Sequence, residues 1–197
     1  MSENVAFAPT LSDAIWKNEG SNRLLRGAVL AVIGSALLAL SAKVQVPFYP
    51  VPQTMQTLVV LMIGMAFGSR LGLATVALYL AEGAAGLPIF AGTPEKGIGL
   101  AYMMGPTGGY LLGFVLAAAV VGWLAERGWD RGIVTTAAAM AIGNVVIYLP
   151  GIAWLSAAVG FDKAVLFGMQ PFLLGDAAKL VLAALAMPWA WKMLTRG

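Results

Sequence analysis

Long apolar stretches recur along the whole chain and are separated by short polar or proline-containing connections. A helix needs about 20 predominantly apolar residues to cross the hydrocarbon core of a bilayer. We predict six such helices, at residues 24–42, 52–67, 70–84, 107–125, 133–157 and 170–192. The second and third are short, and the tight Gly68-Ser69-Arg70 link between them predicts an antiparallel hairpin. The pattern therefore predicts an all-α integral membrane protein with six transmembrane helices.

The composition agrees with a chain that crosses the membrane several times. Of its 197 residues, 60% are hydrophobic and 11% are charged, whereas soluble domains carry about 25% charged residues. The sequence has neither histidine nor cysteine, which removes the commonest general base and the usual zinc and haem ligands. It also has no P-loop motif. We therefore expect no enzymatic activity, no ATP hydrolysis, no metal site and no cofactor, and the net charge of +3 gives no indication of nucleic-acid binding.

The placement of basic residues predicts the orientation of the chain. Residues 1–22 lack the order of charge, apolar core and cleavage site of a signal peptide, and we expect a cytoplasmic segment there, followed by one six-helix transmembrane domain at 23–197. Six spans place both termini on one side of the membrane. That side carries Lys17, Arg23, Arg26, Arg70, Arg127, Arg131, Lys192 and Arg196, and the opposite loops carry Lys43, Lys96 and Lys163. Because positive residues are retained in the cytoplasm, both termini are expected there.

Two connections on the opposite side are unusual for a helical bundle. The first, 43–53, contains Pro47, Pro50 and Pro52, which prevent a regular helix. The second, 85–106, is long and rich in glycine and proline, and long loops in compact folds are usually lids or binding loops. We expect both loops to fold over a site on the outer side of the membrane.

Asp176 and Lys179 are the most informative polar residues, because they lie within the apolar stretch 171–191. Their i, i+3 spacing places both on one helix face. A charge at the bilayer centre costs about 2.5–3.5 kcal/mol on insertion scales, so neither side chain is expected to face lipid. The pair is interpreted either as an ion pair that fixes helix packing or lies near the interface, or as a binding site. Such a site suits a ligand with both donors and acceptors, such as a cyclic urea or a molecule with a carboxylate.

Neutral polar residues gather at the starts of the second and fourth spans. Amides and hydroxyls recognise ligand polarity without the desolvation cost of a charge. The first group comprises Gln45, Gln53, Thr54, Gln56 and Thr57. The second includes Thr107 and Tyr110, at a helix amino terminus whose free N–H groups suit an anionic ligand. Ligand contact and simple capping or close helix packing remain alternatives for both groups.

Small residues recur every four positions along the first span, where they form a stripe that lets another helix approach closely. The stripe consists of Gly27, Ala31, Ser35 and Ala39. Spacing alone does not decide whether its partner is a helix of this chain or a separate subunit. Three further polar residues near span ends are interpreted as packing or interface residues: Glu82, Asn144 and Tyr148.

Several short motifs follow one another in a specific order over roughly residues 24–190. They are Pro50-Val51-Pro52, Thr54-Met55-Gln56-Thr57-Leu58, Gly86-Leu87-Pro88-Ile89-Phe90-Ala91-Gly92, Gly105-Pro106-Thr107-Gly108-Gly109-Tyr110-Leu111, and Pro171-Phe172 with Gly175-Asp176 and Lys179. Together they resemble the BioY proteins, which are the biotin-binding S components of energy-coupling factor transporters. One departure is Thr93-Pro94-Glu95-Lys96, which is more charged than the glycine-rich run expected there.

The resemblance implies a compact bundle of six helices with both termini cytoplasmic, in the cytoplasmic membrane of a prokaryote, with one biotin bound near the outer face. It implies that Asp176 and Lys179 contact biotin, and two poses for its ureido group and valerate carboxylate stay open. The other site residues expected from matching motifs are Gln56, Gly92, Thr107 and Tyr110. The resemblance also implies that the stripe from Gly27 to Ala39 docks onto a transmembrane coupling subunit, which carries two ATPase subunits.

Three other functions are weighed against biotin import. An S component for another vitamin, such as thiamine or riboflavin, requires a larger aromatic or a more anionic pocket. A stand-alone secondary carrier is distinguished by uptake without ATPase partners. An intramembrane enzyme is disfavoured, because the chain lacks His and Cys and has no acidic pair at metal or catalytic spacing.

Overall fold

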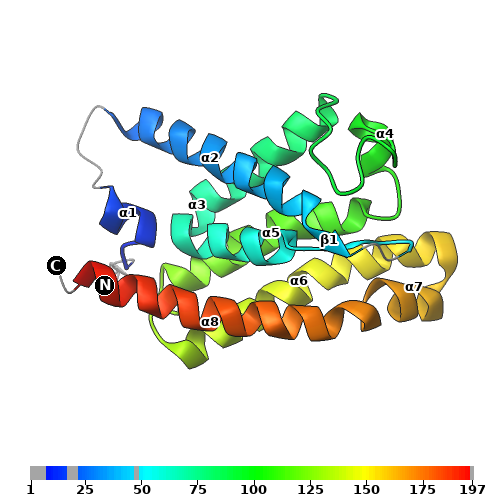
Figure 1. Ribbon diagram of the computed structural model, residues 1–197. Coiled ribbons are helices and arrows are strands. Elements are labelled where there is room, and N and C mark those ends of the chain that lie inside the picture. Colours follow the sequence, from blue (N-terminus) through cyan, green and yellow to red (C-terminus); the bar gives the residue numbers. More distant parts are fainter. Residues whose placement is uncertain (1–7, 17–21, 47–48, 196–197) are drawn as a thin grey trace, which may run out of the picture.

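The computed structural model describes residues 8–16, 22–46 and 49–195, most of them in helices (Figure 1). The helices are α1 (Leu11–Ile15), α2 (Arg23–Lys43), α3 (Gln56–Ala84), α4 (Gly99–Met103), α5 (Gly108–Ala125), α6 (Ile133–Val159), α7 (Phe161–Gly168) and α8 (Leu173–Thr195). The strands β1 (Gln45–Val46) and β2 (Gln53–Thr54) form an antiparallel hairpin, and the 3-10 turn η2 (Gln170–Phe172) precedes α8. Of the expected amino-terminal segment, residues 1–7 and 17–21 lie outside the described residues.

The long helices lie where the apolar pattern predicted spans. In the described part of the chain, five helical segments are long and apolar enough to cross a membrane: α2, α3, α5, α6 and the segment formed by α7 and α8. Because α3 is bent into two arms, these five segments form six apolar helical parts, and the predicted all-helical architecture is confirmed. The short helices α4 and α7 were not predicted, because they lie in segments interpreted as connections.

Gly68 divides α3 into the two predicted arms. Its φ of +80° lies in the left-handed region, which glycine adopts without a steric penalty. The backbone N–H and the hydroxyl of Ser69 both donate to Glu126 Oε1 at 2.8 Å, which stabilises the bend. Beside the bend the arms touch, because a methyl group at Gly72 would lie 3.0 Å from the Cα of Gly64. The predicted hairpin is therefore confirmed.

The bundle is built around α3 and α5, which pack against each other. α5 also packs against α6, and α6 packs against α7 and α8. α2 packs against α3 and β2 and lies at one edge of the bundle (Figure 1). Close helix contacts depend on small residues, since a methyl group at Gly113 of α5 would lie 2.7 Å from the carbonyl oxygen of Ile147. The largest fully buried side chains include Leu38, Leu61, Tyr79, Met140 and Leu155.

The two ends of the bundle differ in structure. α1, the start of α2 and the end of α8 lie at one end, where an ion pair of 2.9 Å joins Asp13 to Arg26 (Figure 1). The β-hairpin, α4 and α7 lie at the other end. Both loops that were expected to cover a site are therefore found at the same end, away from the described termini.

Candidate ligand-binding site

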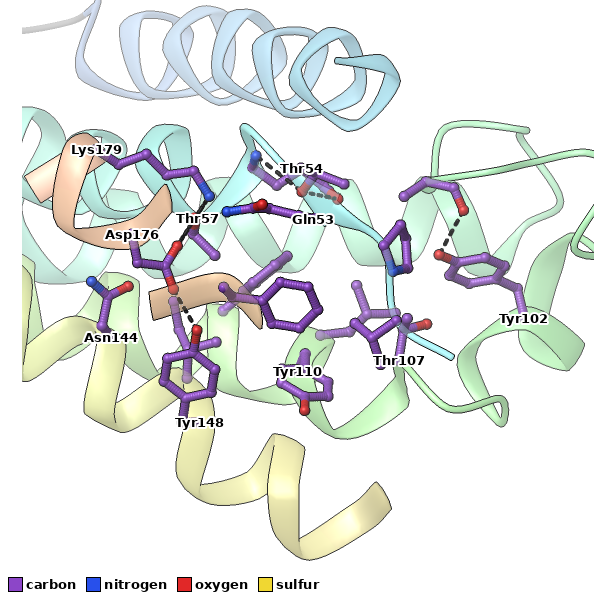
Figure 2. Close-up of a pocket in the computed structure, with 18 residues that line it drawn as sticks. Gln53, Thr54, Thr57, Tyr102, Thr107, Tyr110, Asn144, Tyr148, Asp176 and Lys179 are labelled. Carbon is purple, nitrogen blue, oxygen red and sulfur yellow. Dashed lines mark hydrogen bonds and ion pairs between the residues drawn. The ribbon is translucent and has the colours of Figure 1, made fainter. Parts of the chain in front are cut away.

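A cavity of about 60 Å³ lies beneath the β-hairpin and α4 (Figure 2). Side chains from the hairpin, α3, α4, α5, α6, η2 and α8 line it, and its aromatic members are Tyr102, Tyr110, Phe114, Tyr148 and Phe172. Pockets that hold small organic ligands usually measure roughly 300–1,000 Å³. The cavity in this structure is therefore smaller than most pockets that hold such ligands.

Asp176 and Lys179 form one wall of this cavity, one turn apart on α8 (Figure 2). Lys179 Nζ donates to Asp176 Oδ1 at 3.0 Å, and the two residues are 7% and 6% exposed. The ammonium also donates to Thr57 Oγ1 at 2.9 Å. Within the described residues these contacts use two of its three N–H donors, which leaves one donor to face a ligand.

Tyr148 contacts the second oxygen of the Asp176 carboxylate: its hydroxyl donates to Asp176 Oδ2 (Figure 2). Asn144 lies four residues earlier on α6 and also lines the cavity. Asn144 and Tyr148, interpreted from the sequence as packing or interface residues, thus lie at the cavity beside Asp176. Their i, i+4 spacing places both on one face of an apolar helix, but neither carries the charge that singled out Asp176 and Lys179.

Gln56, Thr107 and Tyr110 line the cavity, as expected for site residues. Gln56 is 4% exposed, and its Nε2 donates to the hydroxyl of Tyr79 at 2.8 Å, which orients the amide. The hydroxyl of Tyr110 donates to the carbonyl oxygen of Gly168 at 2.8 Å. Its hydroxyl therefore supports packing against α7, and its ring contributes to the cavity wall.

Gly92 is not among the residues that line the cavity, and its neighbour Ala91 takes that place. Gly92 has a φ of +72°, and a methyl group there would lie 2.8 Å from Cδ of Lys96. Gly92 therefore shapes the turn of the loop, and the structure does not bring it to the cavity with the other expected site residues.

Both expected cover loops reach the cavity. In the first, a methyl group at Gly175 would lie 1.7 Å from Gln53 Nε2, so the bare glycine leaves room for this amide beside Asp176. In the second, the hydroxyl of Tyr102 donates to the carbonyl oxygen of Ala91 at 2.8 Å. Burial raises the pKa of Tyr102 above its usual value, which keeps the hydroxyl protonated as a donor.

The small-residue stripe of α2 faces α3. Ala31 and Ser35 are 9% and 2% exposed, and the hydroxyl of Ser35 donates to Glu82 of α3. Gly27 and Ala39 are half-buried. The stripe is therefore a contact within the chain, and Ala31 and Ser35 are not a free docking surface because α3 covers them.

Comparison with known proteins places these features in one family. The sequence profile of the BioY family matches residues 12–196. A biotin transporter BioY of Thermotoga maritima is 39% identical over 162 residues, which cover 82% of this chain and 93% of that protein. A biotin transporter BioY of Rhizobium etli is 40% identical over 172 residues, covering 81% and 90%. A probable biotin transporter BioY of Pyrococcus horikoshii is 36% identical over 156 residues, covering 79% and 90%.

A solved structure shares the architecture. It is the crystal structure at 2.1 Å of the S-component for biotin from an ECF-type ABC transporter. The match covers 89% of this chain and 95% of that chain, with a TM-score of 0.73 at 21% sequence identity. At this identity the likeness establishes the all-helical fold.

Proposed function

The chain belongs to the BioY family, and we propose that it binds biotin beside Asp176 and Lys179 and imports it as the substrate-binding component of an energy-coupling factor transporter. The observation that carries this proposal is the pair itself: an acid and a base, both buried, in the wall of a cavity. Relatives named as biotin transporters match most of the chain, which supports biotin as the ligand.

The chemistry of the cavity suits biotin. Biotin has a cyclic urea with two N–H donors and one oxygen acceptor, a thioether ring, and a carboxylate tail. Asp176 accepts from the ureido N–H groups, and Lys179 donates either to the ureido oxygen or to the carboxylate. The aromatic rings of Tyr110, Phe114 and Phe172 provide the apolar contact for the thioether ring.

The distribution of Lys and Arg between the two ends of the bundle supports one orientation of this chain in the membrane. The described basic residues at the end with α1 are Arg23, Arg26, Arg70, Arg127, Arg131 and Lys192. Those at the end with the cavity are Lys43, Lys96 and Lys163. Because basic residues are retained inside, we place the termini in the cytoplasm and the cavity toward the outer face of the cytoplasmic membrane.

ATP-driven transport would need partners, because the sequence has no P-loop with which to hydrolyse ATP itself. We propose a transmembrane coupling subunit that carries ATPase subunits. The face of α2 that α3 leaves exposed offers the docking surface, since a peripheral helix packed on one side has its other side open to lipid or to a partner. This face includes Ala28, Val32, Ala36 and Leu40.

The test is equilibrium binding of labelled biotin to the detergent-purified chain, with thiamine and riboflavin as competitors. We expect saturable binding near one site per chain that unlabelled biotin displaces and the other vitamins do not. Displacement by thiamine or riboflavin would reassign the ligand, and the absence of binding would contradict the proposed function.

Uptake into proteoliposomes tests the second half of the proposal. We expect biotin accumulation when the chain is reconstituted with a coupling subunit and ATPases and supplied with ATP. Equal accumulation by the chain alone would identify a secondary carrier instead.

Replacing Tyr148 by phenylalanine is expected to weaken biotin binding about tenfold, because the Asp176 carboxylate loses a donor that orients it. Tyr49→Phe is the matched control, since Tyr49 is 89% exposed on the first cover loop. The dissociation constants of both variants are measured with labelled biotin. An unchanged constant for Tyr148→Phe would remove Tyr148 from the site.

A further inference from the structure

Lys43, the last residue of α2, holds a loop that is distant in the sequence. Its Nζ donates to the carbonyl oxygens of Pro88 at 2.8 Å, Phe90 at 3.1 Å and Thr93 at 3.1 Å. It also donates to Thr93 Oγ1 at 3.0 Å. An ammonium has three N–H donors, so four acceptors at these distances saturate it. One side chain thus gathers the backbone of residues 88–93.

This loop borders the ligand cavity. Ala91, in its middle, lines the cavity and is 4% exposed. Other contacts of the loop come from the body of the bundle: Tyr79 of α3 donates to the carbonyl oxygen of Ile89 at 3.1 Å, and Tyr102 of α4 donates to that of Ala91 at 2.8 Å. Lys43 adds a charged contact from the edge helix α2.

The same end of α2 also carries the first cover loop. Val44 follows Lys43 directly, and its carbonyl oxygen accepts from the backbone N–H of Met55 at 3.0 Å, which closes the β-hairpin. α2 itself packs against α3 and β2 (Figure 1). A movement of α2 relative to α3 therefore displaces both the start of the loop 43–53 and the Lys43 ammonium that holds residues 88–93.

We propose that Lys43 is a positioning residue that makes closure of the cavity depend on the position of α2. With α2 seated on α3, the ammonium holds residues 88–93 across the cavity. When a partner shifts α2, the ammonium withdraws, the carbonyl oxygens lose their charged donor, and the loop releases Ala91 from the cavity wall. The use of biotin as the ligand rests on the proposed function. The coupling of the loop 88–93 to α2 does not.

The chain has no cysteine, so Ala91→Cys introduces a unique thiol. This thiol is buried in the loop 88–93, where Ala91 is 4% exposed. The rate at which a maleimide labels this thiol, measured without biotin, reports opening of the loop. Adding Lys43→Met, which keeps the length of the side chain and removes its donors, is expected to raise the rate about tenfold. The control is Lys163→Met, an exposed lysine of α7 at the same end of the bundle, and it is expected to leave the rate unchanged. An unchanged rate with Lys43→Met would overturn the proposal.

A second variant tests the dependence on α2. A methyl group at Gly34 would lie 2.5 Å from Cγ2 of Thr75 on α3, so Gly34→Val moves α2 away from α3. We expect it to accelerate labelling of the Ala91→Cys thiol when Lys43 is present and to add little in the Lys43→Met background, because both changes remove the same contact. Equal accelerations in both backgrounds would show that α2 and the loop act independently, and would overturn the coupling.

Biotin kinetics give the functional readout. Lys43→Met is expected to raise the dissociation rate of biotin about tenfold and to raise, not lower, its association rate, because the same opening of the loop admits and releases the ligand. A slower association with unchanged dissociation would overturn the role of Lys43 in closure. Failure of the parent chain to bind biotin would contradict the proposed function, and the labelling rates would still decide the coupling.

Discussion

Replacing Asp176 by asparagine is expected to weaken biotin binding about 100-fold or more. The carboxylate accepts hydrogen bonds from Lys179, Thr57 and Tyr148, and we propose that it also accepts from the ureido N–H groups of biotin. Asparagine offers one acceptor oxygen, presents an NH₂ group to donors, and leaves the buried ammonium of Lys179 without its counter-charge. The measurement is equilibrium binding of labelled biotin to the purified variant, at a temperature below its unfolding midpoint.

The matched control for this change is Asp162→Asn, at the exposed start of α7, where the same chemical change is expected to leave affinity unchanged. Size-exclusion chromatography and a thermal melt establish that the Asp176→Asn variant remains a folded, monodisperse bundle. If that folded variant bound biotin as tightly as the parent, Asp176 would have no part in recognition.

Replacing Lys179 by methionine is expected to weaken biotin binding by a similar factor, about 100-fold. Methionine keeps the apolar stem of the side chain and removes the donors to Asp176, Thr57 and the ligand. It also leaves a carboxylate buried at 6% exposure without its ion-pair partner. Lys163→Met, at an exposed position, is the control, and titration with labelled biotin measures both affinities.

The double variant Asp176→Asn with Lys179→Met separates recognition from packing. Removing one partner of a buried ion pair is strongly destabilising, whereas removing both charges together is often close to neutral. We therefore expect the thermal midpoint of the double variant to recover toward that of the parent, while biotin binding stays lost. Recovery of binding together with stability would instead identify the pair as a structural ion pair.

Much of the architecture followed from the sequence because the relevant signals are local. A membrane span depends on a continuous apolar stretch, and each predicted span contains an apolar helix or one of the two shorter arms of α3. The bend in α3 depends on a backbone conformation that Gly68 adopts easily. Likewise, the cost of a charge in lipid was sufficient to single out Asp176 and Lys179 for the interior.

What the sequence left open mostly concerns contacts between segments that are distant in the sequence. Asn144 and Tyr148 were interpreted as packing or interface residues, and nothing in α6 alone indicates that Tyr148 lies against Asp176 of α8. The spacing of Ala31 and Ser35 predicted a helix contact, but only the fold revealed that the partner is α3.

By itself, the sequence determined which segments form apolar helices, where the chain bends, and which polar side chains are costly to expose to lipid, because each of these depends on the local free energy of transfer or on backbone sterics. Only the tertiary structure decided which of those side chains face one another. It placed Tyr148 against Asp176, Ala91 rather than Gly92 on the cavity, and Lys43 on the carbonyl oxygens of 88–93. Hydrogen bonds act over about 3 Å between groups tens of residues apart, so the packing of the helices sets these pairings.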